Sequence, residues 1–296
     1  MSGQVKRFFL KIWAVCLLIC FSLVQLHHEA RACTLWAAGG SRAEGGGVIL
    51  AKNRDMPPNH RQELRLVRPP GGYRYFGLFA RRGDEAGLRA GVNEKGLVMV
   101  DAAASCIPKG ERRRPMVRHL NEKILAACAD VDAVLRRQLM FIGPAYYLIA
   151  DPRRAVILEV GLDGARSVTG FTQGVLAHTN HYLNLGLAEN NCKVKPGSQV
   201  RLERIRELLD RRPRPLTLED FIAMSEDRQD GPDHSIWRRG STRKKTRTLA
   251  SWIISLPHHG PPSLYVKLAN PGEPPVAHRF RLDPAFWSQA SGLLGE

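Results

Sequence analysis

This chain of 296 residues lacks several features that would point directly to a function. It has no Cys-x-x-Cys pair and no cysteine and histidine spacing typical of a metal site, so we predict neither a bound metal nor a cofactor. No nucleic-acid-binding motif and no long low-complexity stretch occur. After residue 32 no apolar run approaches the ~20 residues of a membrane span. The ordinary apolar fraction excludes disordered and fibrous proteins, and we predict one folded domain over residues 33–296.

The first 32 residues differ from the rest. Basic residues precede an apolar run over residues 12–26, and the small residues Ala30 and Ala32 stand three and one positions before Cys33. This pattern is typical of a secretory signal peptide, so we expect cleavage before Cys33 and export to the periplasm or the medium. Two alternatives remain, an uncleaved anchor and acylation of Cys33 as in a lipoprotein, although a lipoprotein site favours a Leu-like residue in place of Ala30.

Acidic residues are scarce, and the net charge is +16. Such an excess can attract anionic substrates, anionic membrane surfaces or nucleic acid. The basic residues are scattered, with local runs at 112–114 and 238–247. We therefore favour a solvated basic surface over a specific polyanion site and predict no nucleic-acid partner.

The hydrophobic pattern predicts strands at both ends of the domain and helices in the middle. Strands are predicted over 33–38, 47–53, 64–68, 74–80, 88–92, 97–102, 145–150, 155–160, 175–178, 249–256, 263–268 and 278–282, and helices over 115–128, 131–139, 199–211 and 217–223, the last with Thr217 as N-cap. Glycines at 39–40 and 45–47 bracket a turn, so the first two strands form a hairpin. Strands and helices that do not alternate singly indicate an α+β fold with mainly antiparallel sheets and helices on an outer face.

A cysteine at the first position of a mature chain has a chemical capability that an internal cysteine lacks. Its own α-amine, with a reference pKa near ~8, can take the thiol proton and later return it to the leaving group. Nucleophile and base then belong to one residue, and no histidine is required. Cys33 is therefore the candidate nucleophile, although an ordinary cysteine can also follow a cleavage site.

Two further segments add candidate site residues. Lys52, Arg54 and Asp55 lie at the end of the second strand of the hairpin, which returns beside Cys33. A carboxylate there can hold the α-ammonium or the thiol, and a nearby cation can lower the thiol pKa. A solvated charged turn is the alternative interpretation.

The segment 178–181 supplies Asn180 and His181. The amide of Asn180 is a usual type of oxyanion donor. Its two flanking histidines lack the helix and further ligands that a metal site needs. The pair His258-His259 sits in a turn rich in proline and glycine and is expected at the surface.

Taken in order, these segments resemble the penicillin acyltransferase-type (acyl-CoA:6-aminopenicillanic acid acyltransferase-like) cysteine hydrolases. These belong to the N-terminal-nucleophile (Ntn) superfamily, alongside choloylglycine hydrolases and acid ceramidase-like amidases. The segments that carry the resemblance are Cys33-Thr34, Asn53-x-Asp55, Gly91-Val92-Asn93-Glu94-Lys95-Gly96-Leu97, His178-Thr179-Asn180-His181 and, toward the end, Thr246-Arg247-Thr248-Leu249-Ala250-Ser251 and Leu268-Ala269-Asn270-Pro271.

The resemblance implies an αββα sandwich with the nucleophile on the first strand. It makes Cys33 the nucleophile and the source of the base, and it matches Asp55 to the aspartate near the nucleophile and Asn180 to the oxyanion asparagine. Arg247 matches an arginine near the active site, in an alignment that can slip by one residue. We assign substrate binding to Lys52, Arg54 and His181.

The chain departs from the family pattern at two positions. Lys52 stands where the choloylglycine branch usually has arginine, which excludes a bidentate role there. A second asparagine expected after the strand that follows Gly96 is replaced by Asp101-Ala102-Ala103. A backbone N–H is then the candidate for the second oxyanion donor.

The expected reaction is hydrolysis of a linear, non-peptide amide in a small N-acyl substrate. We favour hydrolysis over acyl transfer because coenzyme A is a cytoplasmic donor and this chain is expected outside the cytoplasm. An acyltransferase and a non-catalytic exported or lipid-anchored protein remain as alternatives. The sequence leaves open the oligomeric state and the pairing of Cys106, Cys128 and Cys192.

Overall fold

The computed structural model describes residues 32–81, 86–113 and 117–294. The predicted leader therefore lies, apart from Ala32, outside the described residues, as does Pro115, where the first helix was expected to begin. Within the described part of the chain, no helix is long and apolar enough to cross a membrane.

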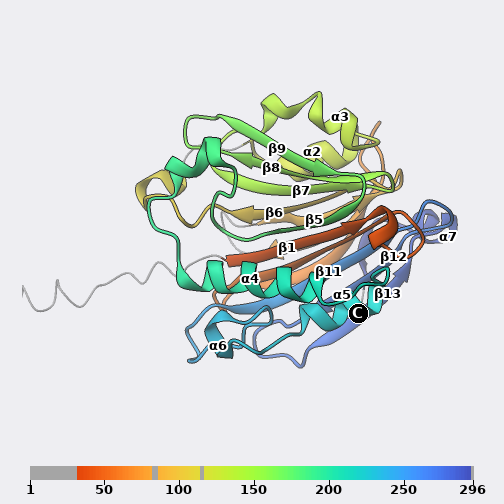
Figure 1. The fold of residues 1–296 in the computed structure, drawn as a ribbon. Helices are drawn as coiled ribbons and strands as arrows, with labels where there is room; N and C mark the ends of the chain where they lie inside the picture. Colours follow the sequence, from red (N-terminus) through yellow and green to blue (C-terminus); the bar gives the residue numbers. More distant parts are fainter. Residues whose placement is uncertain (1–31, 82–85, 114–116, 295–296) are drawn as a thin grey trace, which may run out of the picture.

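Two large antiparallel sheets form the centre of the molecule (Figure 1). The six-stranded sheet has the order β10-β1-β2-β11-β12-β13, and the eight-stranded sheet has the order β14-β3-β4-β5-β6-β7-β8-β9. The strands are β1 (Ala32–Gly39), β2 (Val48–Met56), β3 (Arg61–Val67), β4 (Tyr75–Arg81), β5 (Gly87–Asn93), β6 (Val98–Ala103), β7 (Ala145–Asp151), β8 (Arg154–Val160), β9 (Arg166–Phe171), β10 (Gly174–His178), β11 (Arg247–Leu256), β12 (Ser263–Leu268), β13 (Val276–Arg281) and β14 (Gly292–Leu294).

Most helices pack on the outer faces of the two sheets, and the last one packs against the core between the sheets. The helices are α2 (Leu120–Ala127), α3 (Val131–Leu135), α4 (Pro196–Asp210), α5 (Leu218–Ser225), α6 (Gly231–His234) and α7 (Pro284–Ser288), with short 3-10 helices η1 (Gly40–Arg42), η3 (Gly110–Arg113), η4 (Gln138–Met140) and η5 (Leu185–Asn190). Residues of α2 and α3 pack on the eight-stranded sheet, and residues of α4 and α5 pack on the six-stranded sheet. The predicted α+β class and αββα layering are confirmed.

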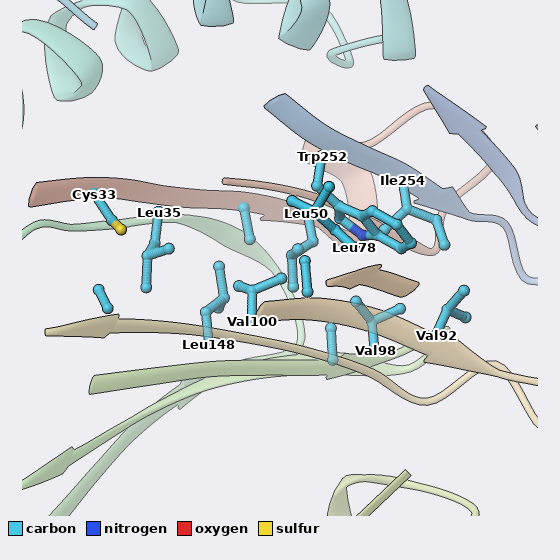
Figure 2. Packing of buried hydrophobic residues seen from close by; sticks show 14 of the residues in the cluster. Cys33, Leu35, Leu50, Leu78, Val92, Val98, Val100, Leu148, Trp252 and Ile254 are labelled. Atoms are coloured by element: carbon cyan, nitrogen blue, oxygen red, sulfur yellow. The ribbon is translucent and has the colours of Figure 1, made fainter. Parts of the chain in front are cut away.

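The main core lies between the sheets because strand side chains alternate between faces. In β1 the odd-numbered Cys33 and Leu35 belong to this inner core, whereas Trp36 packs outward against Phe221 of α5. Figure 2 shows the Cys33 side chain directed toward the second sheet, in the same row as Leu35. The nucleophile candidate therefore has its sulfur in the space between the sheets.

The predicted hairpin of β1 and β2 is present, and its register brings Cys33 opposite Arg54. Gly45 and Gly46 in its turn have φ values of 77° and 73°, the left-handed region that glycine adopts without a Cβ clash. Thr217 caps α5 through a reciprocal capping box with Asp220.

Among the described residues, four strands and α-helices were missed by the pattern analysis. They are β9, α6, α7 and β14, of which β9 is largely exposed along an edge and the others have three to five residues. Such segments bury too little apolar surface to leave a periodic signal. The helix expected over 131–139 is divided into α3 and η4.

Candidate active site

Cys33 is the second residue of β1, and the residue before it, Ala32, pairs with Asp55 of β2. Because directly opposed residues of an antiparallel pair point to the same face, Cys33 shares the inner face with Arg54, and Asp55 lies on the outer face. The sequence motif Lys52 to Asp55 thus divides between the two faces of one strand. All four of its residues are buried, which rules out a solvated turn.

Charged groups accompany the Cys33 thiol on the inner face. Burial raises the pKa of the thiol, and the cations Lys52 and Arg54 oppose this effect. Arg54 Nε donates to Gln62 Oε1 at 2.8 Å. Lys52 Nζ donates to Asp101 Oδ1 at 2.7 Å, which places that aspartate in the charged surroundings of the thiol.

Asn180 contacts the main-chain nitrogen of Cys33. Its Oδ1 accepts from Cys33 N at 2.9 Å, and its Nδ2 donates to Ala103 O at 2.9 Å. The Asn180 backbone is held as well, since Ser105 N donates to its carbonyl and Ser198 Oγ accepts from its N–H. Two residues predicted from separate motifs, Cys33 and Asn180, therefore meet at hydrogen-bonding distance.

Asp55 lies on the outer face and is fully buried. Its Oδ1 accepts from Thr248 Oγ1 at 2.7 Å, and its Oδ2 lies 3.8 Å from an Nη1 of both Arg201 and Arg238. Burial raises the pKa of Asp55, and the two arginines oppose that rise. A register shift in β11 between Thr248 and Ala250 turns the Thr248 hydroxyl toward this carboxylate.

Arg201 of α4 is a site residue that the sequence analysis missed. Its Nη1 donates to Cys33 O at 2.6 Å and to Thr34 Oγ1 at 2.7 Å, and its Nη2 donates to Asn180 Oδ1 at 3.0 Å. The side chain is 2 % exposed. One guanidinium thus links the main-chain carbonyl of Cys33, the candidate nucleophile, to Asn180 and Asp55. The signal available in the sequence was its place beside Leu202 and four residues before Ile205, on the apolar side of the predicted helix.

Arg247 is placed elsewhere. Its Nη2 donates to the carbonyls of Thr242 and Arg243, and none of its described hydrogen bonds involves Cys33, Asp55 or Asn180. The next residue, Thr248, makes the contact with Asp55. A slip of one residue would lead to a threonine rather than an arginine, and the arginines that lie near Asp55 are Arg201 and Arg238.

His181 faces the helix layer rather than the thiol. Its Nδ1 lies 2.9 Å from Ser198 Oγ and 3.3 Å from Thr179 Oγ1. Burial, together with the charges of His178 and Arg201, lowers the pKa of His181 to about 4, so the ring is neutral near pH 7. These contacts anchor the segment that carries Asn180 onto the first turn of α4.

A second buried pair supports the same segment from the inner side. His178 Nε2 lies 3.0 Å from Glu159 Oε1, and the Glu159 carboxylate accepts the N–H groups of Leu183 and Asn184. The hydrogen bonds from His178 and from these two backbone groups outweigh burial, so the pKa of Glu159 is lowered. The chain on both sides of Asn180 is therefore fixed.

The four cysteines in the described part of the chain are free, and Cys192 is the exposed one. The described residues contain no group of three or more histidine, cysteine, aspartate or glutamate side chains able to hold a metal ion. His258 and His259 are exposed.

Residues 42–273 match the family model of acyl-coenzyme A:6-aminopenicillanic acid acyl-transferase. The chain belongs to this family. Membership places it among the Ntn amidohydrolases and acyltransferases, the group indicated by its sequence motifs. A comparison with curated proteins gives no match.

Solved structures of the same fold agree with the family. A variant of conjugated bile acid hydrolase from Clostridium perfringens is 15 % identical, with a TM-score of 0.55 over 89 % of this chain and 97 % of that one. Penicillin V acylase from Agrobacterium tumefaciens is 17 % identical, with a TM-score of 0.54 over 88 % and 91 %. The Caenorhabditis elegans orthologue of N-acylethanolamine-hydrolyzing acid amidase is 14 % identical, with a TM-score of 0.52 over 89 % and 100 %. The family's members and these neighbours share the Ntn-hydrolase architecture.

Proposed function

We propose that this family member is an exported cysteine amidohydrolase that cleaves the linear amide bond of a small N-acyl substrate. The observation that carries the proposal is the contact of Cys33 N with Asn180 Oδ1 at 2.9 Å, at the beginning of the first strand. Removal of the leader before Cys33 would turn this nitrogen into a free α-amine. The base would then already be positioned by the oxyanion asparagine and its surroundings.

Asp55 supports the same assignment. Its Oδ2 is buried and has no hydrogen-bond partner among the described residues. The carboxylate pairs in register with Ala32, the residue that cleavage would remove. The α-ammonium that forms once the amine has taken the thiol proton would offset the cost of burying that oxygen and keep the carboxylate ionised.

In the proposed reaction the α-amine takes the proton of the Cys33 thiol, and the sulfur attacks the substrate carbonyl carbon. Asn180 Nδ2 carries two N–H groups, of which one is bound to Ala103 O. We assign the other to the oxyanion of the tetrahedral intermediate. The α-ammonium then protonates the departing amine as the C–N bond breaks, leaving a thioester on Cys33. Water, deprotonated by the same amine, hydrolyses the thioester and releases the acid.

The neighbours' names indicate the class of substrate to try first. They name conjugated bile acids, penicillin V and N-acylethanolamines, which are all small N-acyl amides. We favour water over an amine as the final acyl acceptor, because the acyl-CoA donor of a transferase is cytoplasmic. Of the three residues expected to bind substrate, we keep the assignment for Arg54, the direct cross-strand neighbour of Cys33. Lys52 Nζ is instead bound to Asp101, and His181 Nδ1 lies 2.9 Å from Ser198 Oγ on the helix side.

The first experiment determines the amino terminus of the purified exported protein by intact-mass and peptide mass spectrometry. The expected terminus is Cys33 with a free amine. A lipid-bearing Cys33 would support the anchored, non-catalytic alternative, and a start at another residue would overturn the proposed base.

The second experiment measures turnover of a panel of N-acyl amides. Cys33→Ala is expected to lower kcat/KM by about 10³-fold or more, because no other group forms the acyl intermediate. Cys192→Ser is the matched control, since that cysteine is exposed and is expected to have no effect. Full activity of Cys33→Ala would end the proposal, and a transfer product formed faster than free acid would favour the acyltransferase.

A further inference from the structure

One charged residue near Cys33 has no part in the proposed reaction. Asp101 of β6 is 18 % exposed and binds Lys52, which is 1 % exposed. Lys52 Nζ donates to Asp101 Oδ1 at 2.7 Å and to the main-chain carbonyl of Arg89 in β5 at 2.6 Å. A lysine of the six-stranded sheet is therefore bound by two strands of the other sheet.

The strand geometry explains how Lys52 reaches that far. The register of β5 and β6 runs from Val92↔Val98 to Ala90↔Val100, and the two strands then continue toward Arg89 and Asp101. The Lys52 ammonium sits at the end of this ladder and binds the β5 carbonyl. Val98, Val100 and Ala102 face the inner core, so Asp101 projects from the opposite face of β6, where Tyr147 is its cross-strand neighbour. Lys52 thus extends from the inner core through the second sheet.

Lys52 is also close to the nucleophile in register. It pairs with Leu35, two residues beyond Cys33 on the same face, which makes it a diagonal neighbour of Cys33 at a Cβ separation of about 7 Å. The position of its ammonium group therefore affects the charge experienced by the thiol.

We propose that Asp101 is a positioning residue for Cys33 that acts through Lys52. Its carboxylate holds the Lys52 ammonium beyond the last pair of the β5–β6 ladder, near Arg89 and Asp101, and offsets part of the positive charge of Lys52. The inference rests on the proposed function of Cys33 as nucleophile. A thiol with less uncompensated positive charge beside it stays protonated in the resting enzyme until the α-amine removes the proton.

Several charged groups act on the thiol from the elements packed around it. They are Lys52, Arg54 and Asp55 of β2, Asp101 of β6 and Arg201 of α4. A nearby cation favours the thiolate, and a nearby anion favours the thiol. Loss of the Asp101 charge alone must then make Cys33 ionise at lower pH, whereas loss of the Lys52 charge must make it ionise at higher pH.

The test measures the rate of Cys33 alkylation by iodoacetamide from pH 5 to 10 in the purified full chain as the cell processes it. The alkylated peptide is followed by mass spectrometry, so that Cys192 serves as an internal reference. Asp101→Asn is expected to move the midpoint for Cys33 about one pH unit lower, and Lys52→Met about one unit higher. The acidic limb of kcat/KM against pH should move in the same directions, with a smaller change in KM than in kcat.

Two controls distinguish positioning from a purely structural role. Glu219→Gln removes the carboxylate of an exposed ion pair with Arg279 of β13, at the far edge of the six-stranded sheet, and should leave the midpoint unchanged. Asp101→Glu retains the charge and should restore the profile. If Asp101→Asn does not yield folded protein, Asp101→Ser removes the same charge with a smaller side chain.

An unchanged midpoint in folded Asp101→Asn, accompanied only by a lower Tm, would overturn the inference. A second outcome separates the two proposals, namely a lower alkylation midpoint in Asp101→Asn together with full activity of Cys33→Ala. The charge relationship between Asp101 and Cys33 would then stand, and the proposed function would fail.

Discussion

The two faces of the β1–β2 hairpin surround different parts of Cys33, the side chain on the inner face and the main chain on the outer face. On the inner face, the Cys33 sulfur lies among apolar side chains with Lys52 and Arg54 as its charged neighbours. On the outer face, Asp55 and Arg201 surround the backbone of Cys33 beneath α4. Because side chains alternate between the two faces of a sheet, these two environments meet only at the main chain of Cys33.

This difference explains why the nucleophile candidate stands at the beginning of a strand. A cysteine in the middle of β1 would have its nitrogen committed to the ladder and enclosed by chain on both sides. At the beginning of the strand the nitrogen is instead bound by the side chain of Asn180. Charged groups therefore act on the sulfur from the inner face and contact the main chain of Cys33 from the outer face.

Arg201→Met should have the largest effect on the outer face. It removes a cation that binds Cys33 O and Asn180 Oδ1 and that lies 3.8 Å from Asp55. The free energy of unfolding is expected to fall by about 3–5 kcal/mol, since a buried carboxylate loses a partner, and activity should fall with it. Urea unfolding and kcat/KM of the folded fraction measure the two effects.

The matched control is Arg204→Met, one turn further along α4. Arg204 is also buried, with 7 % of its surface exposed, but it binds Asp227 and Glu207, away from Cys33. It should lower stability without lowering the activity of the folded fraction. Equal loss of activity in both variants would contradict a specific role for Arg201.

Asn180→Ala should have the next largest effect. It tests whether Asn180, which binds the main-chain nitrogen of Cys33, takes part in the reaction as an oxyanion donor. Loss of one oxyanion donor costs about 3 kcal/mol of barrier, or roughly 10²–10³-fold in kcat. KM should change little, and single-turnover acylation kinetics isolate the step. Asn191→Ala is a suitable comparison, because Asn191 binds the backbone of Tyr182 in the following segment and makes no contact with Cys33 among the described residues. A small effect of Asn180→Ala, similar to that of Asn191→Ala, would refute the assignment.

The smallest effect concerns His181, whose pKa is lowered from 6.5 to about 4. As the pH falls below 6.5, the unfolded chain gains a proton on this ring before the folded chain does. Its stabilising contribution is therefore complete above pH 6.5 and is lost between pH 6.5 and 4, by about 1–2 kcal/mol. Urea unfolding at pH 7 and pH 4.5 measures the slope.

His181→Asn should show a shallower dependence on pH over the same range. Other groups also titrate there, so the informative quantity is the difference between the two proteins. Identical slopes would mean that His181 is protonated equally in the folded and unfolded chains.

Much of this molecule could be predicted from local patterns. The β1–β2 hairpin followed from alternating apolar residues and glycines, and the Thr217 cap from its residue type. The pairing of Asp55 with the start of β1 followed from the hairpin itself. The exposed edge strand β9 escaped because its half-buried residues carry no clear period.

The contributions of Arg201 and Asp101 could not be predicted in the same way. Arg201 lies 168 residues from Cys33 in sequence and reaches it across the outer face of the sheet. The partner of Lys52 lies 49 residues away and belongs to the other sheet. No sequence window contains both members of either pair.

The sequence by itself determined the fold class, the family and the candidate nucleophile, since these follow from periodicity and from short motifs that occur in a set order along the chain. Only the tertiary structure decided which cations accompany the sulfur, which arginine holds the main chain and where Arg247 lies. The physical reason is that charges act through space, whereas patterns in a sequence record only neighbours along the chain.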